Sequence, residues 1–324
     1  MTCGSGGKSP GIRAPRSTER KAILNVAQPA RRDVQIQRDI VYGTGIVRPV
    51  AGRPAHAREL KLDLYQPLPT AGDGPRPALV LAFGGAFHRG TKEDDTFGEP
   101  PNRNHAIAWY CREFARLGYV ACSIDYRLVP ENPEPGDTVV VASAAHIPRS
   151  RVDAVRGMLG LPPASDDMLW RGVEAACDDM ALAVRYVRAH AGAWHIDPGR
   201  IAVGGFSAGA RTALNVALGE RERVAAVVAL SGYMHEDDLK RHVAALDRPP
   251  AVLGIYAEHD LDYIAGNCPR MIERMRELGM TCEAVRVPGA THFYPAHARA
   301  LHERDGPTTV WDAIAGFLRR ALAA

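Results

Sequence analysis

Short apolar runs alternate along the chain with longer segments in which apolar residues recur every three or four positions. Short runs rich in β-branched residues predict strands, and the longer periodicity predicts amphipathic helices. The predicted strands lie at residues 34–43, 60–67, 78–85, 119–125, 201–206, 224–230, 251–257 and 282–287. The predicted helices lie at residues 104–117, 173–191, 208–219, 267–279 and 308–322.

The polarity of these strands indicates how the sheet is built. Residues 34–43 and 60–67 alternate polar with apolar side chains, as half-exposed edge strands do. The later strands are almost continuously apolar, which is typical of parallel strands covered on both faces. The order of the elements therefore predicts an α/β fold, with a mostly parallel eight-stranded sheet and helices on both faces.

One connection is much longer than a simple turn. Almost fifty residues separate Asp125, at the end of a predicted strand, from Gly172, near the start of the next predicted helix. Loops of this length are usually functional or form a small subdomain. We expect residues at about 130–172 to form an inserted cap, or lid, over a site. A structural excursion without such a role is the alternative.

Charge is unevenly distributed along the sequence. The 324 residues carry 40 Lys and Arg against 37 Asp and Glu, and this near balance argues against a nucleic-acid-binding protein. Residues 1–32 hold seven of the basic side chains and one acid, so they carry +6 and the remainder carries −3. Their Gly, Pro and Ser content predicts a disordered basic extension, followed by one domain at residues 33–324.

Three features of the sequence bear on where the protein works. No apolar stretch has the roughly 18 to 20 residues that a membrane-spanning helix needs. The first 22 residues lack the apolar core of a signal peptide. The six cysteines are scattered and form no C-x-x-C pair, so we expect free thiols and a cytoplasmic protein. A homo-oligomer is compatible with this sequence.

The strongest chemical signal is the G-x-S-x-G pentapeptide at residues 205–209. It lies between a predicted buried strand and a predicted helix, so Ser207 occupies a sharp strand-to-helix turn. Gly205 and Gly209 suit this turn because a Cβ at either position would collide with neighbouring backbone. The pattern predicts a nucleophilic serine at the carboxyl edge of the sheet, beside helix amides that stabilise an oxyanion.

A nucleophilic serine needs a base, and the base needs an acid that orients it. In this architecture the acid and then the histidine follow the serine along the chain. Asp260 and His292 each follow a predicted strand, and His292 lies in a Gly-containing loop, so they are the predicted acid and base. Asp262 and Glu258 remain alternative acids, although Asp260 lies closer than Asp262 to the rigid strand end.

Acyl transfer also requires hydrogen-bond donors for the negatively charged oxygen of the tetrahedral intermediate. Gly84 and Gly85 directly follow a predicted strand, and their backbone amides can approach a substrate closely. The amide of Ala208, which follows the serine, completes the predicted oxyanion hole. A plain tight turn also uses Gly-Gly, so this motif indicates an oxyanion hole only in combination with the serine turn.

Together these motifs resemble the α/β-hydrolase superfamily, and more closely the hormone-sensitive-lipase-like and acetyl-esterase-like carboxylesterases. The resemblance spans about residues 35–322 and rests on FGGAF at 83–87, DYRL-x-P at 125–130, GFSAG at 205–209, Asp260 and GATHF at 289–293. It implies that Ser207, Asp260 and His292 form a catalytic triad, that residues 83–86 form the oxyanion loop, and that the inserted segment is a cap.

One position departs from the family pattern. Phe83 stands where the family has a histidine that braces the oxyanion loop, and His88 is a candidate to replace it.

Three other groups each have two interpretations. Residues 125–127 form a structural network or face the site, and the acidic residues 93–95 form a solvated loop or contact a polar or cationic substrate. The aromatic residues either pack in the core or line an acyl or alcohol pocket; they are Trp109, Tyr110 and Trp170.

The sequence therefore predicts a serine hydrolase that cleaves small-molecule carboxylic esters through an acyl-enzyme. An amidase, formamidase or peptidase with the same triad is the first alternative, because the motifs do not separate esters from amides. A ligand-binding relative without turnover is the second. The sequence contains no P-loop, dinucleotide-binding fingerprint or metal-ligand cluster, so we expect no cofactor and no metal.

Overall fold

The computed structural model describes residue 1 and residues 31–48, 54–98, 104–244 and 246–323. The chain divides into two units, Met1–Ala30 and Arg31–Ala324, and the structure describes the second almost throughout. Most of the predicted basic extension thus lies outside the described residues. Its last two residues belong to the second unit, where Arg31 pairs with Glu113 and Arg32 pairs with Asp73 at 2.6 Å.

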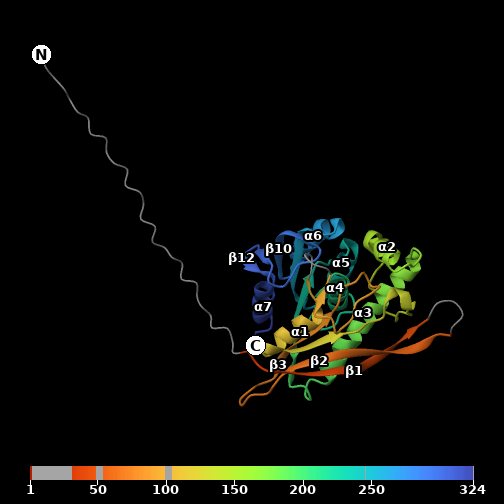
Figure 1. Ribbon diagram of the computed structural model, residues 1–324, viewed down its shortest axis with the longest axis horizontal. Coiled ribbons are helices and arrows are strands. Elements are labelled where there is room, and N and C mark those ends of the chain that lie inside the picture. The colour runs from red at the N-terminus through yellow and green to blue at the C-terminus, as the bar shows by residue number, and fades with distance from the viewer. Residues whose placement is uncertain (2–30, 49–53, 99–103, 245, 324) are drawn as a thin grey trace. The chain divides into compact units, whose positions relative to one another are not determined.

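The second unit is built on one ten-stranded sheet with the order β1-β2-β6-β3-β7-β8-β9-β10-β11-β12 (Figure 1). Its strands are β1 (Val34–Val47), β2 (His56–Pro67), β3 (Arg76–Ala82), β6 (Val120–Ile124), β7 (Ile196–Phe206), β8 (Ala226–Leu230), β9 (Ala251–His259), β10 (Cys282–Thr291), β11 (Arg299–His302) and β12 (Gly306–Thr309). The strands from β6 to β10 in this order pair in parallel, whereas β1, β2, β11 and β12 pair antiparallel. A separate two-stranded sheet consists of β4 (Thr96–Phe97) and β5 (Asn104–His105).

The predicted α/β fold is confirmed, but the sheet has ten strands rather than eight. All predicted strands form, and the hairpin of β11 and β12 extends the sheet beyond β10. These two strands span only four residues each, and β12 contains Pro307 and two threonines. Such short polar segments lack the run of apolar residues that identifies a strand in a sequence, and they form by pairing with β10.

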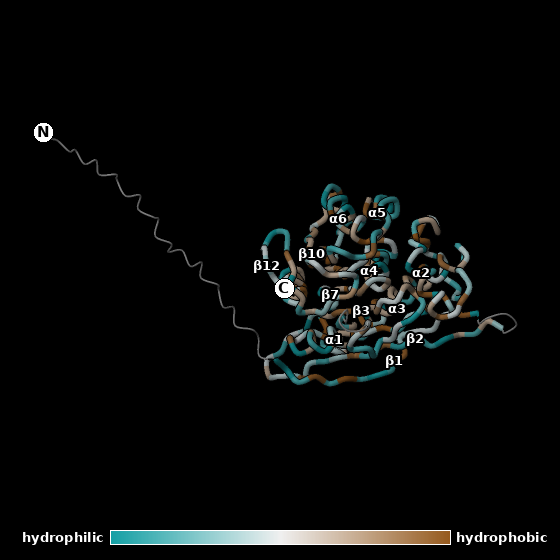
Figure 2. Tube along the Cα trace, turned by 45° about the horizontal axis from the view of Figure 1, so that its top comes forward, coloured by the Kyte–Doolittle hydropathy of each residue, from teal (hydrophilic) through white to brown (hydrophobic). Residues whose placement is uncertain are grey.

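Seven α-helices accompany the sheet within the described residues: α1 (Ile107–Arg116), α2 (Arg149–Met158), α3 (Asp166–Ala189), α4 (Ala208–Leu218), α5 (Glu236–Val243), α6 (Asp262–Glu277) and α7 (Val310–Ala321). On one face, α1 and α7 pack together through Trp109 and Trp311, whose ring centroids lie 5.4 Å apart. On the other face, α3 packs against α4, and α4 lies over β7 and β8. Figure 2 shows the hydrophobic colours concentrated inside the domain around β3, whereas α6 presents hydrophilic residues.

The long connection after β6 contains α2 and two 3₁₀ turns, η1 (Val129–Glu131) and η2 (Ala144–His146). It is shorter than predicted, because α3 begins at Asp166 and not near residue 173. Ser165 caps this helix by accepting a hydrogen bond from the amide of Met168 at 3.1 Å, and two aspartates occupy the first turn. These capping signals precede the apolar periodicity on which the prediction depended.

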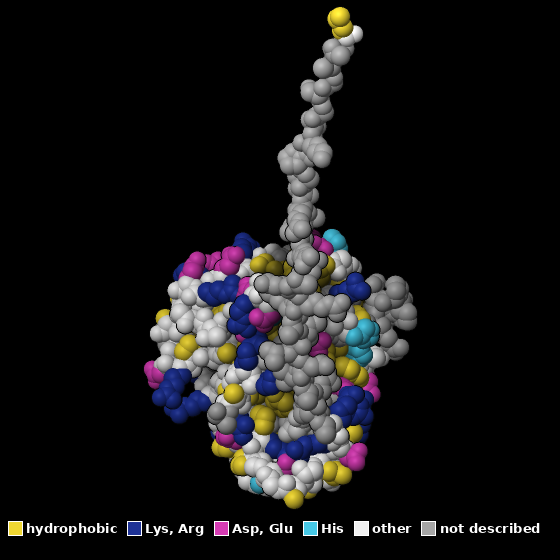
Figure 3. Space-filling view, turned by 90° about the vertical axis from the view of Figure 1, so that its left-hand side faces the viewer, with side chains coloured by type: hydrophobic (Ala, Val, Ile, Leu, Met, Phe, Trp, Pro, Cys, Tyr) yellow, Lys and Arg dark blue, Asp and Glu magenta, His cyan; other side chains and the backbone are white. Residues whose placement is uncertain are grey.

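Three general properties concern the helices, the surface charges and the cysteines. In the part of the chain that the structure describes, every helix is too short or too polar to span a bilayer. On the face drawn in Figure 3, basic and acidic side chains are interspersed. The five described cysteines are unpaired, and four of them are buried; Cys3 lies outside the described residues.

Candidate active site

Ser207 lies in the turn between β7 and α4, at the carboxyl edge of the sheet. Its φ of +54° is in the left-handed region, which is strained for a residue with a side chain. Close backbone packing on both sides imposes this turn: a Cβ on Gly205 would lie 2.5 Å from the carbonyl oxygen of Ala82, and a Cβ on Gly209 would lie 2.1 Å from it. The two glycines therefore allow a turn that presents the Ser207 side chain above the sheet.

The structure brings the three predicted triad residues together. The Oγ atom of Ser207 lies 3.0 Å from Nε2 of His292, and Nδ1 of His292 lies 2.6 Å from Oδ1 of Asp260. Asp260 follows β9 and His292 follows β10, so neighbouring parallel strands place both side chains at the same edge of the sheet. Each of these two residues is only 6% exposed, so their hydrogen bond is largely shielded from water.

Four further hydrogen bonds hold Asp260 and its partner Ser231 in place. Oδ2 accepts a hydrogen bond from Oγ of Ser231 at 2.6 Å and from the amide of Ala257 at 3.1 Å, and Oδ1 accepts from the amide of Leu261 at 2.8 Å. The Ser231 hydroxyl also lies 2.9 Å from the hydroxyl of Tyr294. Burial raises the pKa of Asp260. The hydrogen bonds from His292, Ser231 and the amide of Ala257 lower this pKa by more than burial raises it, so the pKa lies below its usual value.

Sequence reasoning missed Ser231 and Tyr294. A signal for Ser231 exists, because it directly follows the apolar strand at 224–230 and therefore lies at the carboxyl edge of the sheet. No comparable signal marks Tyr294, whose hydroxyl becomes relevant only through its contact with Ser231.

The two alternative acids have other roles in the structure. Asp262 is exposed in the first turn of α6, where a carboxylate stabilises the helix N-terminus. Glu258 is exposed, accepts a hydrogen bond from the amide of Gly289 at 2.8 Å and pairs with Arg286. It thus fastens the start of the loop that carries His292, while Asp260 contacts the imidazole itself.

The predicted oxyanion loop follows β3 and lies against the serine turn. A Cβ on Gly84 would lie 3.2 Å from Cβ of Ser207, and Gly85 has a φ of +128° that favours glycine. Among the described residues, none accepts a hydrogen bond from the amides of Gly85 and Ala86. The amide of Ala208 lies in the first turn of α4, where the helix itself supplies no acceptor. These amides are available to an external oxygen.

The predicted oxyanion loop is braced without a histidine at position 83. Phe83 stacks on the ring of Tyr126 with centroids 4.4 Å apart, and the Tyr126 hydroxyl donates to the carbonyl of Phe83 at 2.8 Å. His88 lies with Nδ1 2.6 Å from the carbonyl oxygen of Ala86 and Nε2 3.1 Å from Nη1 of Arg156. A guanidinium only donates, so Nε2 accepts and Nδ1 carries the proton that binds the loop.

Burial lowers the pKa of His88, and the charge of Arg156 lowers it further. The hydrogen bond to the carbonyl of Ala86 raises this pKa, but by less, so the pKa lies below its usual value. The neutral imidazole therefore fits both of its contacts. Because Arg156 belongs to α2, this chain of contacts connects the inserted segment to the loop beside Ser207.

A small pocket opens beside Ser207 and Ala208. About 460 Å³ of it is free of protein atoms, and part of this space is open to solvent. The inserted segment contributes Ile147 and Val152 to its wall. Its polar and aromatic lining includes Arg151, Arg211, Tyr233 and Tyr263.

The aromatic residues singled out in the sequence pack elsewhere. Trp109 stacks against His105 with centroids 4.1 Å apart, and Tyr110 is buried beside it. The indole of Trp170 donates to the carbonyl of Val141 at 2.8 Å and so holds the inserted segment on α3. None of these three residues is among the described residues that line the pocket beside Ser207.

The residues at 125–127 form a structural network behind the site. The guanidinium of Arg127 donates to Oδ1 of Asp179 from Nε at 2.9 Å and from Nη2 at 2.7 Å. Arg58 pairs with Asp125 at 2.8 Å. These ion pairs connect β2, α3 and the segment after β6, so the charged side chains hold these parts of the domain together.

The acidic residues at 93–95 are also engaged by the protein itself. Lys92, which is 4% exposed, places Nζ 2.8 Å from Asp63 and 2.9 Å from Asp39, and it pairs with Glu93. Burial lowers the pKa of Lys92, but these carboxylates raise it well above its usual value. The ammonium thus occupies the position that a metal ion would take among Asp39, Asp63 and Glu93.

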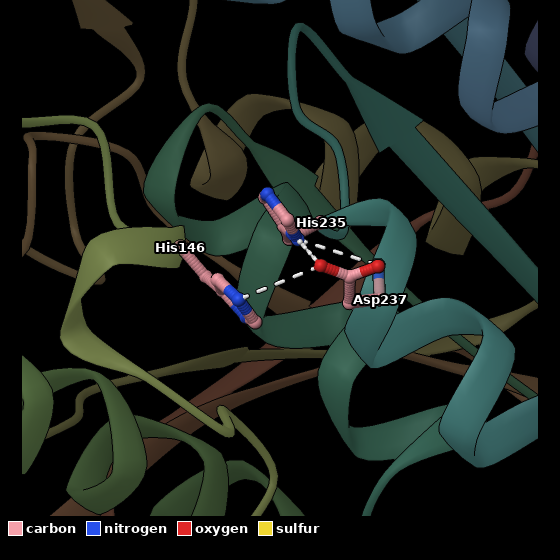
Figure 4. Close-up of side chains that lie close together, drawn as sticks. All are labelled: His146, His235 and Asp237. Carbon is pink, nitrogen blue, oxygen red and sulfur yellow. Dashed lines mark hydrogen bonds and ion pairs between the residues drawn. The ribbon is translucent and has the colours of Figure 1, made fainter.

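A second group of potential metal ligands consists of His146, His235 and Asp237 (Figure 4). The two imidazoles stack with centroids 3.8 Å apart and planes inclined by 6°. Nearly parallel rings direct their nitrogen lone pairs along parallel planes, whereas a tetrahedral zinc site needs lone pairs that converge on one point. Nδ1 of His146 also lies 2.9 Å from Oδ2 of Asp238. The cluster therefore suits a contact between η2 and α5 better than a metal site.

The fold of the described domain is that of an α/β-hydrolase. The BD-FAE family model matches residues 171–269, which is less than half of the chain. Solved structures of esterase 2 from Thermogutta terrifontis share the fold. The form phosphorylated by paraoxon is 19% identical with a TM-score of 0.53, covering 92% of this chain and 97% of that chain. The propionate-bound form is 18% identical with a TM-score of 0.53 and the same coverage. No curated protein matches this chain.

Proposed function

We propose that the protein is a serine hydrolase that cleaves carboxylic esters through an acyl-enzyme. The observation that carries this proposal is the continuous hydrogen-bonded chain from Ser207 through His292 to Asp260, with distances of 3.0 Å and 2.6 Å. A serine whose hydroxyl contacts a histidine that is oriented by a buried carboxylate is an activated nucleophile.

In the proposed mechanism, Nε2 of His292 removes the proton of Ser207 as Oγ attacks the ester carbonyl. Asp260 accepts a hydrogen bond from Nδ1, which fixes the imidazole tautomer and stabilises the cation that forms. His292 then protonates the leaving alcohol, and the acyl-enzyme remains. A water molecule, deprotonated by the same histidine, releases the acid.

The negative charge of the tetrahedral intermediate requires backbone donors. We assign this role to the amides of Gly84, Gly85 and Ala208, and we add Ala86 because it lines the pocket together with Ser207 and Ala208. This loop lies close to the serine turn, because a Cβ on Gly84 would lie 3.2 Å from Cβ of Ser207.

The comparisons support an ester as the substrate. The BD-FAE match covers the serine turn and Asp260, and the structural neighbours are an esterase phosphorylated by paraoxon and the same esterase with propionate bound. The closer resemblance to hormone-sensitive-lipase-like and acetyl-esterase-like carboxylesterases is part of this proposal. A small pocket favours short acyl or alcohol groups.

The test combines covalent labelling with turnover. We expect a fluorophosphonate probe to label the wild-type protein and 4-nitrophenyl acetate to be hydrolysed. Ser207→Ala removes the attacking oxygen, so labelling disappears and kcat falls by about 10⁴- to 10⁶-fold. Ser150→Ala changes an exposed serine of α2 and serves as a control that retains labelling. Persistent labelling of Ser207→Ala contradicts the assignment, and faster cleavage of 4-nitroacetanilide than of 4-nitrophenyl acetate identifies an amidase.

A further inference from the structure

Arg211 is a buried cation beside the nucleophile. It lies on α4 four residues after Ser207, is 5% exposed, and lines the same pocket. One of its nitrogens, Nη1, donates to the carbonyl of His146 at 3.0 Å. Among the described residues, no partner accepts a hydrogen bond from its buried Nε and Nη2 atoms. Most of the donor capacity of this guanidinium is thus unused.

Among the described residues, Arg211 has little compensation for its charge. Its guanidinium carbon lies 5.8 Å from the ring centroid of Tyr233, a weak attraction for a cation. The ion pairs between described residues do not include Arg211, and the described residues that line the pocket contain no aspartate or glutamate. A buried charge without a counter-ion costs folding free energy, so its position calls for a ligand.

A second arginine contributes to the same wall from the inserted segment. Arg151, on α2, lines the pocket and lies with its guanidinium carbon 5.8 Å from the ring centroid of Phe293. Burial lowers the pKa of Arg151, and the nearby charge of Arg89 lowers it further. The pocket therefore holds an excess of positive charge that a bound anion would relieve.

We propose that Arg211 and Arg151 form an anion subsite beside Ser207, and that the preferred substrates are esters carrying a carboxylate near the scissile bond. A carboxylate in this subsite accepts hydrogen bonds from Nε and Nη2 of Arg211, the geometry that a guanidinium offers to planar anions. The chemistry of the cleavage is unchanged. This inference rests on the proposed esterase function and specifies its substrate class.

Two pairs of esters test the proposal on either side of the scissile bond. Mono-4-nitrophenyl adipate carries the carboxylate on the acyl group, and 4-carboxyphenyl acetate carries it on the leaving group. In each pair the neutral partner has the same carboxylate masked as a methyl ester. At pH 7 we expect kcat/KM of at least one anionic ester to exceed that of its masked partner by about 10- to 100-fold, as charged hydrogen bonds allow.

Variants then assign the preference to the subsite. Arg211→Gln is expected to reduce the ratio between anionic and masked esters to near one, and Arg211→Lys to restore part of it. Arg319→Gln removes an exposed charge of α7 and leaves the ratio unchanged. Wild-type ratios at or below one for both pairs overturn the subsite, as does a loss in Arg211→Gln that is equal for both members of a pair.

These results separate the two proposals. Hydrolysis of the masked esters without any preference for the anionic ones contradicts the anion subsite and leaves the esterase function supported. Failure of all four esters, together with absent fluorophosphonate labelling, overturns the esterase function and the subsite with it.

Discussion

The hydroxyl of Ser231 lies 2.6 Å from Oδ2 of Asp260, the carboxylate oxygen that His292 does not contact. Ser231 follows β8 and Asp260 follows β9, so adjacent parallel strands bring the two side chains to the same edge of the sheet. This hydrogen bond fixes the rotation of the carboxylate and thereby the direction in which Oδ1 faces the imidazole.

Replacing Ser231 is expected to weaken catalysis without removing it. Ser231→Ala deletes one hydrogen bond to a charged acceptor, which corresponds to a reduction of kcat by about 10-fold or somewhat more. Tyr294→Phe keeps the bond between Ser231 and Asp260 and is expected to have a smaller effect. Steady-state kinetics on 4-nitrophenyl acetate measure both, and equal losses in the two variants would contradict a direct role for the serine hydroxyl.

The acid of the proposed triad can be identified by comparing two conservative changes. Asp260→Asn preserves shape but favours the wrong imidazole tautomer, so kcat is expected to fall by about 10³- to 10⁴-fold. Asp262→Asn removes an exposed carboxylate from the first turn of α6 and is expected to change kcat by less than about threefold. The reverse ranking, measured on folded variants, exchanges the two assignments.

Arg156 is expected to act as a positioning residue through His88. Arg156→Met removes the donor at 3.1 Å from Nε2 of His88, so the imidazole is less firmly held against the carbonyl of Ala86. We expect kcat to fall by about 10-fold with little change in KM, because the proposed oxyanion loop would act on the transition state. Arg156→Lys is expected to recover part of the loss. A change confined to KM would place Arg156 in substrate binding instead.

The buried carboxyl group of Glu174 is expected to make the free energy of unfolding depend on pH. This residue is 1% exposed and accepts hydrogen bonds from the amides of Val140 and Val141, which fasten the inserted segment to α3. Burial raises its pKa from the usual 4.5 to about 7, against the lowering effect of the two amides. The folded protein therefore retains a proton up to about pH 7 that the unfolded chain releases near pH 4.5.

The free energy of unfolding should consequently decrease as pH rises from about 4.5 to 7. The side chain in Glu174→Gln cannot ionise. Between pH 4.5 and 7 we therefore expect the free energy of unfolding of this variant to decrease by about 1–3 kcal/mol less than that of the wild type. Urea unfolding at several pH values measures this difference. Glu236→Gln, at an exposed position of α5, is the control and should leave the slope between pH 5 and 8 unchanged. An unaltered slope in Glu174→Gln would argue that this carboxyl is ionised throughout.

Local sequence patterns determined the central strands, the serine turn and the order of the candidate triad. Each depends on neighbouring residues: a run of apolar residues predicts a buried strand, Gly205 and Gly209 permit the turn at Ser207, and Asp260 and His292 directly follow strands. Parallel strands place their carboxyl ends at one edge, so the pattern also implies that these side chains lie close together.

Tertiary structure alone decided the features that depend on distant partners. The strands β11 and β12 are too short and polar to be recognised before they pair with β10. His88 and Arg156 are 68 residues apart, and neither has a local signal for its contact with the other. Arg211 looks like an ordinary helical arginine in the sequence. Folding buries its guanidinium beside Ser207, where none of the described residues supplies a counter-ion, and burial is a property of the whole packed domain.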